Sequence, residues 1–209
     1  MNGHIEERRK MISEAFHTLN QPLTGLHCGL EIALQKPRSD DEYRKRIGDG
    51  VDNAGVILQL VRAIRQLVEA GDPGERFGTV DLALVLSQLE GELGVVAEAV
   101  QVKVSVHHNG TCKVMADPLK LMAAIGTLAD ERIRSAGAGT SVEVDMEVVG
   151  GHATVKFGGD SVASAIDGRT LDSKLADIRC NAAYCYLWSI GGQVEATGTG
   201  LVITLPLAS

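Results

Sequence analysis

Residues 16–32 read FHTLNQPLTGLHCGLEI and combine the apolar repeat of a helix with an internal proline. From Ile12 to Ala33, apolar side chains recur at alternating steps of four and three residues, the heptad repeat of a helix that packs along another helix. His17 lies one position off this repeat, among polar side chains at helical spacing. Pro22 has no backbone N–H to donate, which costs a helix about 3 kcal/mol. The stretch therefore predicts a long helix with an exposed histidine just before a weakened turn.

Two such helices follow one another in the first third of the chain. The first is predicted over residues 4–35 and ends at a turn that contains a proline. The second begins after Ser39, where Glu42 three residues later forms a capping box, and Gly71 ends it. The short turn between them predicts an antiparallel helical hairpin.

Both helices also carry a second apolar edge beside the heptad repeat. Examples of this second edge are Ala15, Leu34, Ile57, Leu60 and Leu67. One hairpin alone cannot cover both edges, and two-fold pairing into a four-helix bundle is the commonest way to bury them. The sequence therefore predicts a homodimer.

The rest of the chain alternates helical and strand patterns, which predicts an α+β fold. A linker rich in glycine divides the chain into a helical domain at 1–72 and a second domain at 79–209. In the second domain, helices are predicted at 81–98, 117–135 and 172–190, and strands at 102–107, 112–115, 141–148, 153–157, 193–197 and 200–206. Alternating apolar and polar residues in the strands predict an α/β sandwich with helices on one face of the sheet. Tyr184, Tyr186 and Trp188 are expected to pack the last helix against that sheet.

Composition excludes several classes of function. The chain has 209 residues, a net charge of −7 and only 3% aromatic residues, which disfavours nucleic-acid binding. Its four cysteines form no C-x-x-C pair, so neither a metal site nor a disulfide framework is predicted. There is no signal peptide and no apolar run of membrane-spanning length. We expect a cytoplasmic protein with no membrane or nucleic-acid partner.

Several motifs resemble those of bacterial sensor histidine kinases. HTLNQPL (17–23) resembles their phosphoacceptor box, a histidine followed by a proline on the first helix of a dimeric hairpin. VMADPLKLMAAIGTLADERI (114–133) and SIGGQVEATGTGLVITLPL (189–207) resemble, in outline, parts of their ATP-binding domain. The resemblance covers nearly the whole chain and implies a kinase-like fold.

The sequence departs from active kinases at the nucleotide site. Kinases hold nucleotide and magnesium with two asparagines on the helix within 114–133, and the matching positions here are Thr127 and Glu131. The glycine-rich phosphate loop expected before the last helix is also absent from 167–180. Phosphoryl transfer from ATP depends on positioning the γ-phosphoryl group, so these departures imply that ATP is not the donor.

A kinase fold that keeps the histidine and lacks the ATP site resembles the dimeric bacterial histidine phosphotransferases of the ChpT type. HTLNQP (17–22) followed by Gly29, Leu30 and Glu31 is similar to their histidine box. The resemblance implies a phosphorelay in which an aspartate of one response-regulator receiver domain phosphorylates His17, which then phosphorylates another. Magnesium would be bound by the receiver domain, and this chain would hold no cofactor. Thr18 departs from both families, which usually have an acidic residue there.

The predicted catalytic residue is therefore His17, acting as a neutral imidazole nucleophile. Its predicted polar contacts to the phosphoryl group are Lys10, Thr18, Asn20, Gln21 and Thr24. A receiver domain would dock beside them, with Leu23, Leu26 and His27 as possible contacts, although a core role is favoured for the leucines and a surface or packing role for the histidine.

Two alternatives remain open on the sequence. One alternative to the phosphotransferase is a divergent sensor histidine kinase core that phosphorylates itself with ATP. The other is a dimeric adaptor that binds response regulators without catalysis. Labelling of His17 by ATP alone would favour the kinase. Phosphate relay between two receivers by a His17→Ala variant would favour the adaptor or a different nucleophile.

Overall fold

The fold is given by a computed structural model that describes residues 2–35, 37, 39–108, 110–159, 171–197 and 200–208. Residues 160–170, which include part of the stretch expected to lack a phosphate loop, lie outside these ranges. The helices are α1 (Asn2–Leu34), α2 (Asp40–Glu69), α3 (Leu82–Ala99), α4 (Pro118–Ser135) and α5 (Leu171–Ser189). The strands are β1 (Gly78–Asp81), β2 (Lys103–His108), β3 (Lys113–Ala116), β4 (Ser141–Val149), β5 (His152–Gly158), β6 (Gln193–Thr197) and β7 (Gly200–Pro206).

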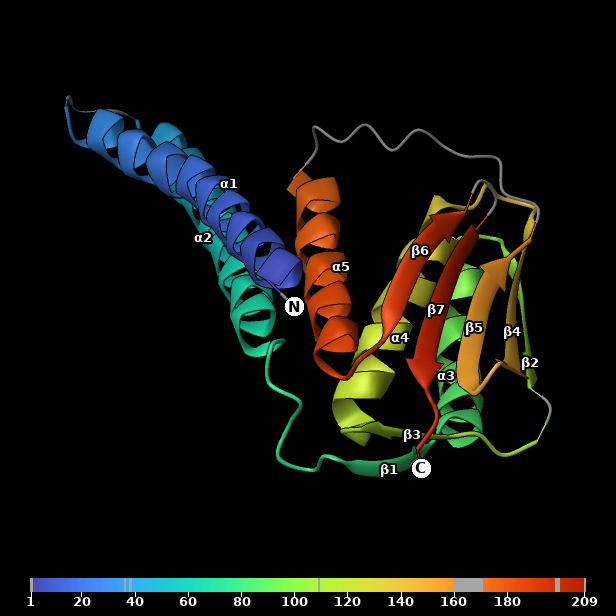
Figure 1. The fold of residues 1–209 in the computed structure, drawn as a ribbon. Coiled ribbons are helices and arrows are strands. Elements are labelled where there is room, and N and C mark those ends of the chain that lie inside the picture. Colours follow the sequence, from blue (N-terminus) through green and yellow to red (C-terminus); the bar gives the residue numbers. More distant parts are fainter. Residues whose placement is uncertain are drawn as a thin grey trace.

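The predicted hairpin is formed by α1 and α2, which lie side by side (Figure 1). Helix α1 continues through Pro22 without a break, because the packing of a long helix outweighs the loss of one backbone hydrogen bond. The capping box is present: Ser39 Oγ accepts a hydrogen bond from the Glu42 backbone N–H at 3.3 Å, and the Ser39 N–H donates to the Glu42 carboxylate at 3.1 Å. At the other end, the Arg8 guanidinium donates to the carbonyl of Val68, which satisfies one of the last free carbonyls of α2.

The second unit is a mixed sheet with helices on one face, as predicted. The strand order is β2-β4-β5-β7-β6, with β2 parallel to β4 and the other pairs antiparallel. Figure 1 shows α3, α4 and α5 together on one side of this sheet. The β4–β5 turn contains Gly150 and Gly151 with φ of 59° and 80°, the conformation of a primed hairpin turn that only glycine adopts without strain.

One strand was not predicted. Strand β1 lies at the end of the stretch interpreted as a linker and pairs with β3 in a separate two-stranded sheet. Asp81 ends β1 and caps α3, since its carboxylate accepts hydrogen bonds from the backbone N–H of Ala83 at 3.0 Å and of Cys112 at 3.2 Å. Four residues are too short to show an alternating pattern in the sequence.

The hairpin packs against α5, which lies between it and the other two helices of the sheet layer (Figure 1). On the predicted second edge, Ala15, Leu60 and Leu67 are buried, whereas Leu34 is exposed. By contrast, many residues of the heptad repeats are exposed in the single chain: Ile5, Phe16, Leu23, Leu30, Ile47, Val51, Leu58, Val61 and Val68. We call these nine residues the open edge of the hairpin.

The helices within the described ranges are all too short or too polar to cross a bilayer.

Candidate functional site

His17 lies in the first half of α1 with its side chain exposed to solvent. Lys10, Asn20, Gln21 and Thr24, which share its face of the helix by spacing, are exposed as well. The buried side of α1 lies elsewhere, around Ala15. The geometry leaves the imidazole accessible to a macromolecule that approaches from solvent.

Thr18 and Lys10 are engaged with the same neighbour. The Thr18 hydroxyl donates a hydrogen bond to the backbone carbonyl of Glu14, one turn earlier, at 3.1 Å. The hydroxyl proton of Thr18 is therefore used within the helix. The Lys10 ammonium lies 3.9 Å from the Glu14 carboxylate, in an ion pair open to solvent. Glu14 therefore partly neutralises the cation nearest to His17 on α1.

Gln21 links this face to the second unit. Its side-chain carbonyl accepts a hydrogen bond from the Lys174 ammonium of α5 at 3.0 Å. Nearer the start of α1, the His4 ring stacks on Trp188 with centroids 4.7 Å apart. Trp188 thus packs against the hairpin, rather than only against the sheet as expected. Tyr186 is buried as predicted, and its hydroxyl accepts a hydrogen bond from the Asp117 backbone N–H at 2.9 Å.

Asp117 precedes α4 in the motif that resembles kinases, and it has a structural role here. Its carboxylate accepts hydrogen bonds from the N–H groups of Leu119 at 3.0 Å, Lys120 at 3.2 Å and Arg76 at 3.1 Å. Burial opposes ionisation, but these bonds and the charge of Lys120 outweigh it and hold the pKa of Asp117 below its usual value. The carboxylate caps α4 and ties the segment after α2 to it.

A groove of about 410 Å³ lies between α4 and α5, and it contains both positions that are matched by sequence spacing to the kinase asparagines. Thr127 and Glu131 line it together with Asp130 and Asp172. Burial raises the pKa of Glu131, and the carboxylates of Asp130 and Asp177 raise it further. Burial and the same acidic groups raise the pKa of the Cys180 thiol, also in the groove, to about 12. The groove thus presents carboxylates, with Arg134 and Arg179 as its cationic lining residues.

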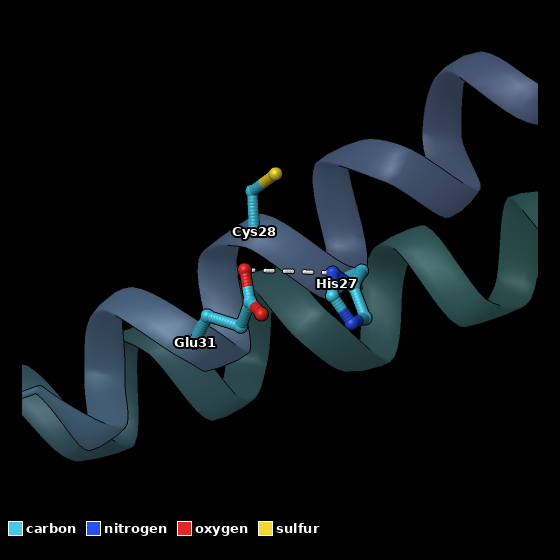
Figure 2. A group of neighbouring side chains, drawn as sticks. All are labelled: His27, Cys28 and Glu31. Atoms are coloured by element: carbon cyan, nitrogen blue, oxygen red, sulfur yellow. Dashed lines mark ion pairs between the residues drawn. The ribbon is translucent and has the colours of Figure 1, made fainter.

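One set of side chains offers metal ligands, although none was predicted. His27, Cys28 and Glu31 lie on the exposed face of α1, with their donor atoms within 4.8 Å of one another (Figure 2). The His27 ring nitrogen is 3.6 Å from the Glu31 carboxylate, and the Cys28 thiol points upward from the helix in Figure 2, above this pair. Nitrogen, sulfur and oxygen ligands of this kind suit zinc. All three side chains are exposed to solvent.

Sequence reasoning did not single out Glu14 or Lys174. Glu14 is recognisable from its spacing to Lys10 and His17 on one helix. Lys174 gives no such signal, because it lies 153 residues from its partner Gln21. Only the docking of α5 against α1 brings it to this face.

The geometry can be compared with known proteins. No family model matches the chain. Over 145 residues it is 26% identical to the sensor protein IrlS of Burkholderia pseudomallei, covering 68% of this chain and 31% of that one. Over 155 residues it is 26% identical to the sensor protein kinase PmrB of Pseudomonas aeruginosa, covering 73% and 32%. The chain thus spans about a third of the length of these relatives.

Solved structures show the same fold. The histidine kinase AdeS of Acinetobacter baumannii matches with a TM-score of 0.61 at 17% identity, covering 92% of this chain and 98% of that one. Full-length ShkA, solved in complex with AMPPNP, matches with a TM-score of 0.60 at 15% identity, covering 98% and 46%. A histidine kinase from Burkholderia phymatum matches with a TM-score of 0.54 at 14% identity, covering 98% and 99%. The chain is therefore homologous to sensor histidine kinases and shares their fold, with its helical hairpin followed by an α+β unit.

Proposed function

We propose that this chain is a histidine phosphotransferase, which moves phosphoryl groups between receiver-domain aspartates through a phosphohistidine at His17. The observation that carries the proposal is the solvent exposure of His17 on an unbroken helix, within a stretch that resembles a phosphoacceptor box. Homology to sensor kinases makes response-regulator receiver domains the expected partners. We place the protein in the cytoplasm, where such receivers act.

The chemical step needs little from this chain beyond the imidazole. The lone pair of one ring nitrogen forms a bond to phosphorus, while the P–O bond to the partner's aspartate breaks and the carboxylate leaves with the electron pair. The proton on the second ring nitrogen is released to solvent or to a nearby base. The Thr18 hydroxyl, which donates to the Glu14 carbonyl, is too weak a base to accept that proton. The exposed carboxylate of Glu14, one turn away, is available for it.

The α4–α5 groove supports a donor other than ATP. Two positions that hold asparagine in kinases are Thr127 and Glu131 here, and both line the groove. A triphosphate there would meet the carboxylates of Asp130, Glu131 and Asp172, which outnumber the cationic side chains of the lining. Asp130 is paired with Arg134 at 2.9 Å, and Arg179 is the second cation. The competing reading, a divergent kinase core, is favoured by the fact that both curated relatives are sensor proteins, one of them called a kinase.

We also propose that two chains pair through the open edge of their hairpins into a four-helix bundle. The open edge gathers large apolar side chains on both α1 and α2, between 42% and 65% exposed. Exposed large apolar side chains in such numbers are typical of an interface between subunits. The two histidines would then project from opposite sides of the bundle, each free to meet a receiver.

Phosphotransfer assays test the proposed function directly. Purified full-length chain is incubated either with labelled phosphorylated receiver domains or with labelled ATP and magnesium. We expect label on the wild type from some receivers and none from ATP, and no label on His17→Gln. His107→Gln removes another exposed histidine, on β2, and serves as the matched control with wild-type labelling. Labelling of His17 by ATP alone would establish the kinase instead. Receiver binding without any labelling would establish the adaptor.

A further inference from the structure

Helix α5 runs along the half of α1 that carries His17. Contacts between them follow an antiparallel order: Trp188 stacks on His4, the Cys185 thiol lies 3.9 Å from the Met11 sulfur, and Lys174 reaches Gln21. His17 is located between the last two of these contacts along α1. The position of α5 relative to the His17 turn is therefore defined on both sides.

Lys174 brings a positive charge from the second unit to the phosphoacceptor face. Gln21 follows His17 by four residues, so the two side chains share one face about 6 Å apart along the helix axis. The Lys174 ammonium is 3.0 Å from the Gln21 side-chain oxygen. Its partner in this bond is a neutral amide, whereas Lys10 on the same face is paired with the carboxylate of Glu14.

We infer that Lys174 is a catalytic residue that contacts the phosphoryl group during transfer at His17, an inference that rests on the proposed function. A lysine ammonium has three N–H donors and a flexible stem, so it can keep Gln21 and also reach an oxygen of the phosphoryl group. The phosphoryl group carries negative charge both when it arrives and once it is bonded to the ring. The charge of Lys174 acts on the phosphoryl oxygens while the imidazole forms the N–P bond.

This arrangement also gives the second unit a role that needs no nucleotide. One side of helix α5 lines the α4–α5 groove. In the proposed reaction, Lys174 in the first turn of the same helix faces α1. The unit supplies a charge to the histidine without supplying a phosphoryl donor.

The test uses the full chain with Lys174→Gln, which removes the charge and keeps the length, and Lys174→Arg, which restores a cation. Single-turnover transfer from a phosphorylated receiver is followed at increasing receiver concentration. We expect Lys174→Gln to lower the maximal rate about tenfold, the effect of losing one charge-assisted hydrogen bond, with little change in the half-saturating concentration. Lys174→Arg should recover most of the rate. Lys103→Gln, an exposed lysine on β2, is the charge-matched control and should transfer like the wild type.

A second measurement separates this inference from the proposed function. Phosphoramidate phosphorylates accessible histidines without any receiver, so the rate of His17 labelling by phosphoramidate reports on the charge near the ring. We expect Lys174→Gln to slow this labelling several-fold, and Lys103→Gln to leave it unchanged. If receivers donate nothing but this difference is found, the proposed function fails and the role of Lys174 stands. Equal labelling of wild type and Lys174→Gln would overturn it. So would an equal loss in Lys174→Gln and Lys174→Arg, because that pattern indicates a purely structural contact.

Discussion

Leu67 and Leu58 are both leucines of α2, yet the first is 0% exposed and the second is 57% exposed. They represent the two apolar edges of the hairpin. The edge that includes Leu60 and Leu67 is buried in the core that α2 shares with α5, whereas the open edge has no cover within the single chain. In sequence, the open edge is the more regular pattern. The difference teaches that a strong heptad repeat identifies a helix face that packs against another surface. It does not specify whether that surface belongs to the same chain or to a second one.

The polar residues of functional interest on α1 and α4 also differ in their exposure to solvent. On α1 the His17 side chain is exposed to solvent, while on α4 the polar residues Thr127 and Glu131 lie in a partly buried groove. An exposed imidazole suits exchange with a large partner. The groove is lined by the carboxylates of Asp130, Glu131 and Asp172 together with the guanidinium groups of Arg134 and Arg179.

The largest effect is expected at the open edge. Val51→Glu combined with Leu58→Glu places charges into the proposed interface between hairpins, and removing them from water without partners opposes association. We expect the dissociation constant of the dimer to rise at least about 100-fold, measured by sedimentation equilibrium. Leu84→Glu, on an equally exposed apolar residue of α3, should leave the dimer intact. A wild-type chain that is monomeric at micromolar concentration would contradict the proposed interface at the open edge.

Substitutions at the edge that includes Leu60 and Leu67 should lower the free energy of unfolding and leave dimer formation unaffected. Leu67→Ala leaves a cavity beside α5, and we expect the free energy of unfolding to fall by about 2–5 kcal/mol in denaturant titrations. Leu84→Ala, at an exposed site, should change it by less than about 0.5 kcal/mol. A loss at Leu67 no larger than at Leu84 would contradict the observed burial.

The junction between the two units depends on Asp117. Asp117→Ala removes the cap of α4 and the acceptor for Arg76, and should cost about 1–2 kcal/mol at neutral pH. Because the pKa of Asp117 is lowered in the folded state, its contribution is complete above the unfolded-state pKa of about 3.9 and is lost as pH falls through the folded value. The unfolding free energies of the wild type and of Asp117→Ala should therefore differ most at neutral pH and become equal in acid. Asp52→Ala, an exposed site on α2, should show no such convergence.

The smallest effect is expected where α5 meets the start of α1. His4→Ala removes the ring stacked on Trp188 and should lower the free energy of unfolding by about 0.5–1 kcal/mol. His152→Ala, an exposed histidine on β5, provides the comparison in the same chemical denaturation experiment. Equal effects of the two substitutions would mean that the stacking does not stabilise the docking of the hairpin.

Most elements of the fold were predictable because their signals are local. The heptad repeats, the Ser39 capping box and the glycine pair at the β4–β5 turn each act within a few residues, and each is present in the structure. Strand β1 was missed because it is short and exists through pairing with β3. The homodimer, the boundaries of the two domains and the roles of the residues around His17 remain predictions.

By itself, the sequence determined the hairpin, the α+β unit after it and the exposure of His17. The tertiary structure alone decided which edge of the hairpin α5 covers, and it brought Lys174 to Gln21. The physical reason is one of range. Helix periodicity, capping and turn chemistry act between neighbours in the chain, whereas the docking of α5 depends on the fit of surfaces from residues far apart, which no local pattern specifies.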